Sequence, residues 1–305
     1  MINPRTLLLC LAASCAASPP AQVGQTVDPF EGEAELISST PIAEVPLGKF
    51  LADIASSIQA WSQKTWASSN SSDFRKQSLL EHHITQMARE RKEDLLYVLE
   101  AGPQHSRIIA AAALGFTRDQ DVLSPLLDAL EDSDSRLVGN TLLGLTILEH
   151  PDTPTERIAS ILQFDPDPQL RWAAAYCART LVERDVRSDQ LTGAARSALH
   201  DKEPVVRAQC CLLLGIVGDD ESFAAIEGLI LDQVPLVSAA AIRGVGALGE
   251  NSTKLKGACA RALTAHLQSG DSVVRKRVRM SLVQLAGRDY ADDVGMWRTW
   301  ASRLP

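Results

Sequence analysis

The amino-acid sequence predicts an all-α protein, an α-solenoid of stacked helical hairpins. One phrase recurs along most of the chain, and small residues recur within it at helical spacing. No strand-like alternation of apolar and polar residues interrupts this pattern. The 305 residues are 45% hydrophobic and 22% charged, which is enough apolar surface to bury a core. A hairpin of this kind buries its apolar face only against its neighbours, so the repeats are expected to stack.

The recurring phrase contains a turn with Asp or Pro, an arginine, a run of small and apolar residues, and Leu-Gly in its best copies. Successive copies are separated by 29, 35, 36, 31 and 37 residues. A period of this length is typical of a solenoid. The six copies align at Arg107, Arg136, Arg171, Arg207, Ser238 and Arg275.

Two columns of the alignment predict the core between repeats. Positions +3 and +7 after the aligned residue share one helical face. A small residue at +3 lets a paired helix approach closely, and the residue at +7 fills the space between repeats. The +3 column reads Ala110, Gly139, Ala174, Cys210, Ala241 and Val278, and the +7 column reads Leu114, Leu143, Ala178, Leu214, Val245 and Leu282.

A second amphipathic helix is expected between successive arginine helices. It often ends in an apolar residue, one further residue, and then Asp, as in Leu130/Asp132, Leu199/Asp201 and Ile230/Asp232. The expected second helices are 123–130, 158–162, 191–199, 223–230 and 255–267.

These phrases resemble HEAT repeats, specifically the short bacterial kind also found in phycobilisome-lyase-like proteins. The unit DKEPVVRAQCCLLLGIVGDDESFAAIEGLILD, residues 201–232, matches that pattern over its whole length. The resemblance covers roughly residues 100–285, about six repeats. It implies a curved right-handed stack with a scaffold or binding role, and it transfers no catalytic residue.

The expected organisation has four parts: a signal peptide at 1–14, a flexible tether at 15–47, an N-terminal helical cap at 48–99, and the solenoid with its C-terminal cap at 100–305. The cap begins with an amphipathic helix at 49–66, whose apolar stripe includes Phe50, Ile54 and Trp61. At the other end, Trp297 and Trp300 are expected to cover the apolar face of the last repeat. The alternative is that they form an exposed docking point.

The N-terminus has the pattern of an export signal. A single arginine precedes a short apolar stretch that is too short to span a membrane. Cys15 follows small residues, as in the lipobox of bacterial lipoproteins, and is the expected lipidation site. The alternative is ordinary cleavage nearby, for example after Ala17. We therefore expect an exported protein of the cell envelope or periplasm, anchored through lipid at Cys15.

The sequence contains no recognised catalytic motif. It lacks GxSxG, GxxxxGK[ST] and HExxH. His82 and His83 are adjacent on one expected helix, so their side chains diverge and do not readily share a metal. The net charge of −8 argues against a nucleic-acid partner. We expect no enzyme activity, no cofactor and no metal.

The aligned arginines are expected to be structural. An arginine that follows a turn aspartate, as Arg136 follows Asp134 and Arg275 follows Asp271, can bridge adjacent repeats through bidentate hydrogen bonds. Ser238 interrupts this series. Cys210 is expected to be buried in the small +3 column, with a disulfide from Cys177 to Cys210 or Cys211 as the less favoured alternative. The basic run 275–279 is interpreted as a solvated face, or alternatively as a patch for an anionic ligand.

One face of the arginine helices is unexpectedly apolar. In this repeat type these helices line the concave side, and positions +2, +5 and +9 point outward; we call these positions the inner face. A large exposed apolar patch marks a partner site. The alternative is that the chain's own residues 30–66, or tight curvature, fill this face. The partner-binding residues expected on the inner face are Ile109, Phe116, Leu145, Tyr176, Leu212, Ile216 and Arg243.

The function predicted from these features is that of a non-catalytic scaffold or adaptor of the cell envelope, which binds another protein on its concave face. The resemblance to phycobilisome lyases suggests a lyase-like enzyme as the alternative. A structural protein that spaces envelope layers is a third possibility.

Overall fold

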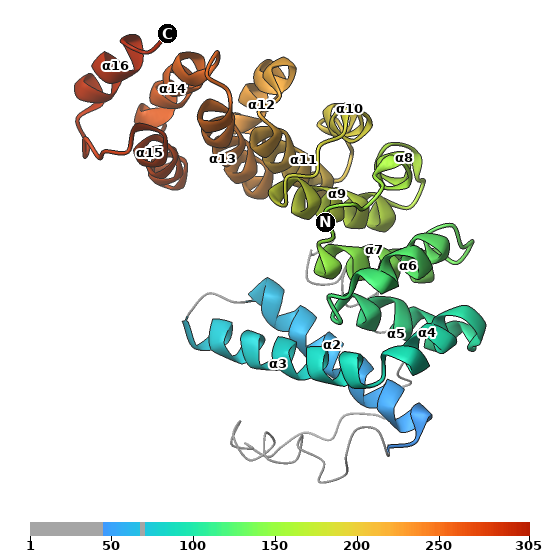
Figure 1. Cartoon of the computed structure of the whole chain (residues 1–305). Helices are drawn as coiled ribbons and strands as arrows, with labels where there is room; N and C mark the ends of the chain where they lie inside the picture. Colours follow the sequence, from blue (N-terminus) through green and yellow to red (C-terminus); the bar gives the residue numbers. More distant parts are fainter. Residues whose placement is uncertain (1–44, 68–70) are drawn as a thin grey trace. The chain divides into compact units, whose positions relative to one another are not determined.

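The computed structural model describes residues 45–67 and 71–305, and every regular element in these ranges is a helix (Figure 1). This confirms the all-α solenoid fold. The expected signal peptide, Cys15 and residues 15–44 of the expected tether lie outside the described residues, and helix α2 (Leu47–Ala67) begins at the last residue assigned to the tether. The chain divides into two units, of which the first ends at Leu148 and the second begins at Glu149. No helix within the described ranges has an apolar stretch long enough to cross a membrane.

The first unit is a helical cap followed by two arginine helices. Helix α2 packs against α3 and α5, and α5 packs against α4 and α7. The predicted helix at 49–66 is therefore observed as α2, and the region 73–101 forms two helices. The helices of this unit are α2 (Leu47–Ala67), α3 (Ser71–Glu90), α4 (Lys92–Ala101), α5 (Gln104–Gly115), the 3₁₀ turn η3 (Gln120–Val122), α6 (Leu123–Ala129) and α7 (Ser135–Leu148).

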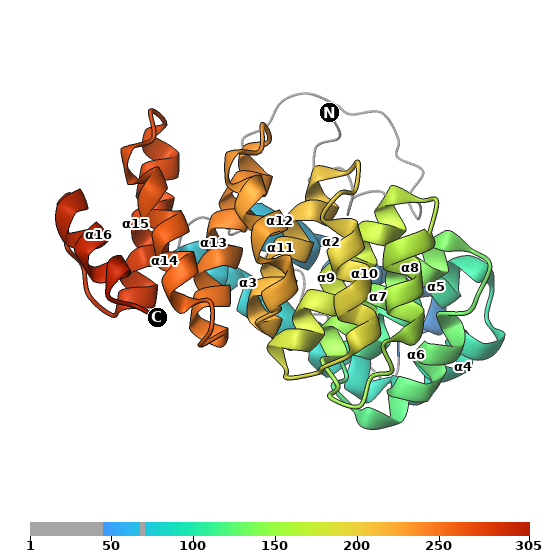
Figure 2. The same ribbon diagram turned by 90° about the horizontal axis from the view of Figure 1, so that it is seen from above.

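The second unit is a stack of two rows (Figure 1). The arginine helices α9, α11, α13 and α15 pack on one another in order, and α8, α10, α12 and α14 form the second row. Figure 2 shows this unit from the side of the second row. Its helices are α8 (Glu156–Phe164), α9 (Pro168–Glu183), α10 (Asp189–Ala198), α11 (Pro204–Val217), α12 (Phe223–Gly228), α13 (Pro235–Asn251), α14 (Lys256–Ala265), α15 (Ser272–Ala286) and α16 (Val294–Ser302), with 3₁₀ turns η4 (Asp220–Ser222), η5 (Leu229–Leu231) and η6 (His266–Gln268).

The starts of the arginine helices follow from their sequences. Pro168, Pro204 and Pro235 each occupy the first turn, where the missing amide hydrogen costs nothing and the fixed φ suits a helix. Asp167 caps α9 by accepting a hydrogen bond from the amide of Gln169 at 2.8 Å. The turn residues of the repeat phrase therefore determine where each of these arginine helices begins.

The predicted core columns are buried. All six residues of the +3 column lie in the interior, and so do five of the +7 column. Leu143 differs, because its side chain is half-exposed. The five expected second helices coincide with α6, α8, α10, α12 with η5, and α14 with η6.

Glycine at the end of the repeat phrase permits close helix contact. A Cβ atom on Gly115 would lie 2.2 Å from the carbonyl oxygen of Gly144. A Cβ atom on Gly215 would lie 2.6 Å from the carbonyl oxygen of Gly244. Both distances are too short for any side chain, so the pairs α5–α7 and α11–α13 require glycine where their backbones meet.

The C-terminal aromatic residues behave as a cap. Trp297 is fully buried, and its indole nitrogen donates to the Ala291 carbonyl at 3.1 Å. Trp300 is half-buried and meets Trp297 edge to face, with ring centroids 5.8 Å apart. The interpretation of Trp297 as cover for the last repeat is therefore confirmed.

The cysteines of the described residues are buried free thiols. Cys177, Cys210, Cys211 and Cys259 form no disulfide, so the alternative pairing of Cys177 is not observed. Burial raises the pKa of Cys211 and of Cys259 to about 12, which keeps both thiols protonated and unreactive near neutral pH.

Candidate functional site

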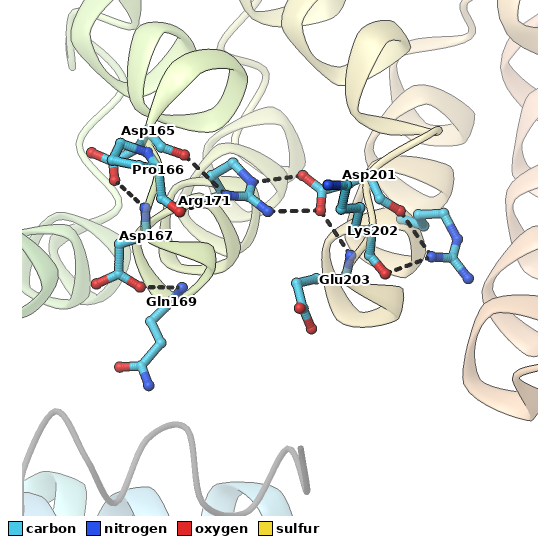
Figure 3. A network of polar contacts seen from close by, with 9 residues as sticks. Asp165, Pro166, Asp167, Gln169, Arg171, Asp201, Lys202 and Glu203 are labelled. Atoms are coloured by element: carbon cyan, nitrogen blue, oxygen red, sulfur yellow. Dashed lines mark hydrogen bonds and ion pairs between the residues drawn. The ribbon is translucent and has the colours of Figure 1, made fainter. Parts of the chain in front are cut away.

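Arg107, Arg171 and Arg207 form a structural ladder, in which each arginine binds an aspartate of the next repeat; Figure 3 shows the contact at Arg171. Arg171 donates two hydrogen bonds to the carboxylate of Asp201, Nε to Oδ2 at 2.7 Å and Nη2 to Oδ1 at 2.9 Å. Its Nη1 also donates to the carbonyl of Asp165 at 3.0 Å. One guanidinium thus joins its own turn to the turn of the next repeat, and this fork geometry is specific to arginine.

The ladder repeats in two other places. Arg207 reaches Asp232 at 3.0 Å, and Arg107 reaches Asp132 at 2.9 Å. The acceptors are the aspartates that end the phrase "apolar, one residue, Asp". The aspartate also serves its own turn, since Asp201 Oδ1 accepts the amide of Glu203 at 2.8 Å.

The bridging role is confirmed for Arg107, Arg171 and Arg207, each of which reaches an aspartate of the next repeat. The two pairs named from the sequence, Asp134 with Arg136 and Asp271 with Arg275, do not bridge repeats. Asp134 pairs with Arg136 inside one turn, and Asp271 caps α15 through the amides of Val273 and Val274. Asp134 does reach the preceding repeat, but through Gln104, whose Nε2 donates to Asp134 Oδ2 at 3.0 Å. Ser238, which occupies the ladder position of α13, is buried and donates to the Ile230 carbonyl at 2.6 Å.

The ladder carboxylates of Asp132 and Asp201 are stabilised in their charged form. Burial alone would raise the pKa of Asp201, but hydrogen bonds from Arg171 and from the Glu203 amide outweigh burial and hold that pKa below its ordinary value. These groups are therefore committed to holding repeats together, which leaves the inner face as the candidate site.

The inner face of the second unit contains a groove. Its wall is built from α9, α11, α13 and α15, and it encloses about 90 Å³. Leu212 and Ile216 are half-buried in it, and Arg243 beside them is exposed. The residues that line the groove are Arg179, Glu183, Leu212, Ile216, Arg243, Gly246, Ala247, Ser281 and Gln284.

Three of the predicted partner-binding residues are thus brought together. Leu212 and Ile216 lie one turn apart on α11, and Arg243 faces the same groove from α13. Tyr176 on α9 is half-exposed and stacks on Trp172 with ring centroids 5.9 Å apart. The guanidinium of Arg179 lies 5.0 Å from the Tyr176 ring centroid, which links Tyr176 to the groove lining.

The first unit corrects the remaining expectations. Phe116 is fully buried, and its ring meets Trp61 of α2 edge to face with centroids 5.2 Å apart. Leu145 is also fully buried, and Ile109 is half-buried. Phe116 and Leu145 are therefore interior residues rather than contacts for a partner. The alternative that the chain's own segment fills the inner face holds at Phe116, because α2 packs against α5.

Sequence reasoning missed several residues of the groove. Arg179 forms an ion pair with Glu183 and donates to Gln209 at 2.8 Å. Gln284 donates to Glu250 at 3.0 Å, and Ser281 is buried at the floor. Ser281, Arg179 and Glu183 lie at +6, +8 and +12, beside the outward positions +2, +5 and +9. Gln284 does lie at +9, but its polar side chain did not stand out on a face recognised by its apolar residues. Only the packing of neighbouring helices brings them to the groove.

No arrangement in the described ranges points to metal chemistry. Among those residues no three or more His, Cys, Asp or Glu side chains are grouped so as to hold a metal ion. The groove holds two arginines, a glutamate and hydrogen-bonding groups beside its apolar residues. This mixture suits a peptide segment, which has a polar backbone and can carry apolar side chains.

Residues 155–246 match a family described as HEAT repeats. No curated protein matches the chain. Among solved structures, the chain is similar to a computationally designed armadillo repeat protein for modular peptide recognition, with 13% identity, a TM-score of 0.48, and coverage of 62% of this chain and 97% of that chain.

Two natural proteins are also similar in structure. Human deoxyhypusine hydroxylase shares 19% identity at a TM-score of 0.37, over 85% of this chain and 97% of the hydroxylase chain. The complex of CpcE and CpcF of the phycocyanin lyase from Nostoc sp. PCC7120 shares 16% identity at a TM-score of 0.37, over 89% and 99%. The chain is an all-α solenoid whose residues 155–246 are similar to HEAT repeats.

Proposed function

We propose that the chain is a non-catalytic scaffold that binds a segment of another protein in the groove of the second unit. The observation that supports this most is the juxtaposition of half-buried Leu212 and Ile216 with exposed Arg243. A monomer gains nothing from leaving two large aliphatic side chains in contact with water along a groove, whereas a partner would bury them.

The groove selects for a partner segment of mixed character. An apolar side chain of the partner fits against Leu212 and Ile216, and an acidic side chain fits near Arg243. Full burial of one aliphatic side chain contributes about 1.5–3 kcal/mol, and an exposed ion pair contributes about 0–1 kcal/mol. Each contact is weak alone, so the partner segment must cross several arginine helices to bind with useful affinity.

The proposal includes a location at the cell envelope, which rests on the sequence of residues 1–15. Lipidation of Cys15 would hold the chain at a membrane, where its partner would also be found. Mass spectrometry of the mature N-terminus tests this point directly. An acylated Cys15 is expected, whereas an unmodified N-terminus at Ser18 would mean ordinary cleavage after Ala17.

Affinity capture with matched variants tests the binding function. A photo-reactive amino acid at position 216 is cross-linked in envelope extracts, in the parent chain, in Leu212→Asp and in Leu231→Asp. Leu231 is 66% exposed on η5 and does not line the groove, so its variant controls for an added charge. The proposal predicts that Leu212→Asp loses the cross-linked partner while Leu231→Asp retains it, with both variants folded by circular dichroism.

Two results would contradict the proposal. Equal cross-linking by both variants would show that the groove does not hold the partner. If the chain were purified with a bound bilin pigment, visible as an absorption band, that result would favour the lyase-like alternative.

A further inference from the structure

The last arginine of the ladder has no aspartate. Arg275 occupies on α15 the position that Arg171 and Arg207 occupy on α9 and α11. Those two bind the carboxylates of Asp201 and Asp232, whereas Arg275 donates to the carbonyl of Ser269. Within residues 45–67 and 71–305, no carboxylate pairs with Arg275.

The aspartates of the turn after α15 are held elsewhere. Arg279, one helical turn beyond Arg275, donates to Asp289 at 2.8 Å and to Asp292 at 2.9 Å. These bonds draw the turn to Arg279, so the guanidinium of Arg275 is left facing a pocket. Lys276 stands beside it, and it too has no carboxylate partner in the part of the chain that the structure describes.

This pocket encloses about 340 Å³ and has two kinds of wall. Three cations and one carboxylate line one part, although the chain as a whole carries a net charge of −8. Apolar side chains line the rest. The lining residues are Leu267, Arg275, Lys276, Arg279, Ala291, Asp292, Val294 and Trp297.

We propose that this pocket binds a carboxylate joined to a small apolar group. The carboxylate pairs with Arg275 and Lys276, as the ladder aspartates pair with Arg171 and Arg207, and the apolar group rests against Leu267 and Val294. Charge-assisted hydrogen bonds from a guanidinium favour this planar anion. The site is separate from the groove, which α15 lines through Ser281 and Gln284, and it does not depend on the proposed function.

Small molecules that differ only in the carboxylate test this assignment. The full chain, labelled with ¹⁵N at tryptophan, is titrated with N-acetylleucine, which has a terminal carboxylate, and with N-acetylleucinamide, which has none. The indole signal of Trp297 reports the pocket. A saturable shift is expected with N-acetylleucine only. A third titration, with the N-acetylated and C-amidated dipeptide Asp-Leu, shows whether a side-chain carboxylate also serves.

Substitutions of the pocket residues test where the carboxylate of N-acetylleucine binds. Arg275→Ala and Lys276→Ala should each weaken N-acetylleucine binding about two- to five-fold, as expected for partly exposed ion pairs. Arg303→Ala removes an exposed arginine outside the pocket and should leave binding unchanged. Lys276 is exposed, so its variant keeps the test valid if Arg275→Ala perturbs the turn at Ser269.

Several results would overturn the proposal. An equal shift with N-acetylleucinamide would show that the carboxylate is not recognised, and unchanged binding in both pocket variants would place it elsewhere. Inorganic phosphate that binds as tightly as N-acetylleucine would mean a general attraction for anions. The absence of any saturable shift with either carboxylate would mean that the cations are simply a solvated face.

Discussion

The two units treat the same helical face differently. In the first unit, position +9 of the arginine helix α5 is Phe116, which is fully buried with Trp61 of α2 against its ring. In the second unit, position +9 of α11 is Ile216, which is half-exposed in a groove. An apolar inner face is thus a core surface where the chain provides a covering helix, and a candidate binding surface where it does not.

The largest difference is expected from side-chain truncation at these equivalent places. Phe116→Ala removes a fully buried aromatic ring and should destabilise the first unit by about 3–5 kcal/mol. Ile216→Ala, at the equivalent position, removes a side chain that is only half-buried and should cost about 1 kcal/mol or less in the second unit. Hydrogen exchange resolves the two units separately. Equal losses at both positions would remove the distinction between a covered and an open face.

Glycine substitutions should rank next. In Gly115→Ala, the added methyl group would lie 2.2 Å from a backbone oxygen of α7, so α5 and α7 must move apart. A destabilisation of about 1–3 kcal/mol is expected. Gly193→Ala on α10 is the matched control, because nothing lies within 4 Å of the added atom, and it should stabilise by up to about 1 kcal/mol. A neutral Gly115→Ala would contradict the close approach of α5 and α7.

The ladder should make a similar or slightly smaller contribution. Arg171→Ala leaves the carboxylate of Asp201, whose side chain is only 9% exposed, without its bidentate partner. A loss of about 2 kcal/mol is expected. Thermal or denaturant unfolding measures it, with the exposed Arg303→Ala as control. A normal melting temperature for Arg171→Ala would count against the ladder.

The smallest expected effect is the dependence of the free energy of unfolding on pH. Because the folded pKa of Asp201 lies below its unfolded value, the ladder contributes fully above about pH 4, and this contribution is lost as the pH falls through the folded pKa. Acid titration of Asp201→Asn should therefore show a shallower loss of stability than the parent chain below pH 4. Identical acid titration curves would mean that ionisation of Asp201 does not contribute to the stability of the folded chain.

Much of the fold follows from the sequence alone. The period located both rows of helices, and the small residues at +3 located the core, because both patterns depend on contacts between nearest-neighbour repeats. The apolar-x-Asp phrase was visible as well, but its role required knowing that Arg171 reaches forward to the carboxylate of Asp201 in addition to the carbonyl of Asp165 in its own turn.

The site was less predictable because it depends on what covers a face. Phe116 and Ile216 occupy the same repeat position and are both large and apolar, so no local pattern separates them. The difference comes from α2, a helix of the same chain about fifty residues before Phe116. The pocket at Arg275 escaped prediction for a similar reason, since it depends on the turn after α15 pairing with Arg279 instead of Arg275.

Thiol accessibility tests the difference between the two faces most directly. Phe116→Cys and Ile216→Cys are compared by alkylation rate in a chain whose Cys10 and Cys15 are replaced by serine; the four cysteines of the helices are buried and serve as slow internal references. We predict rapid alkylation at position 216 and protection at position 116, with protection lost when Trp61→Ala weakens the contact of α2. Protection at position 216 in the purified chain, or free reaction at position 116, would contradict the account.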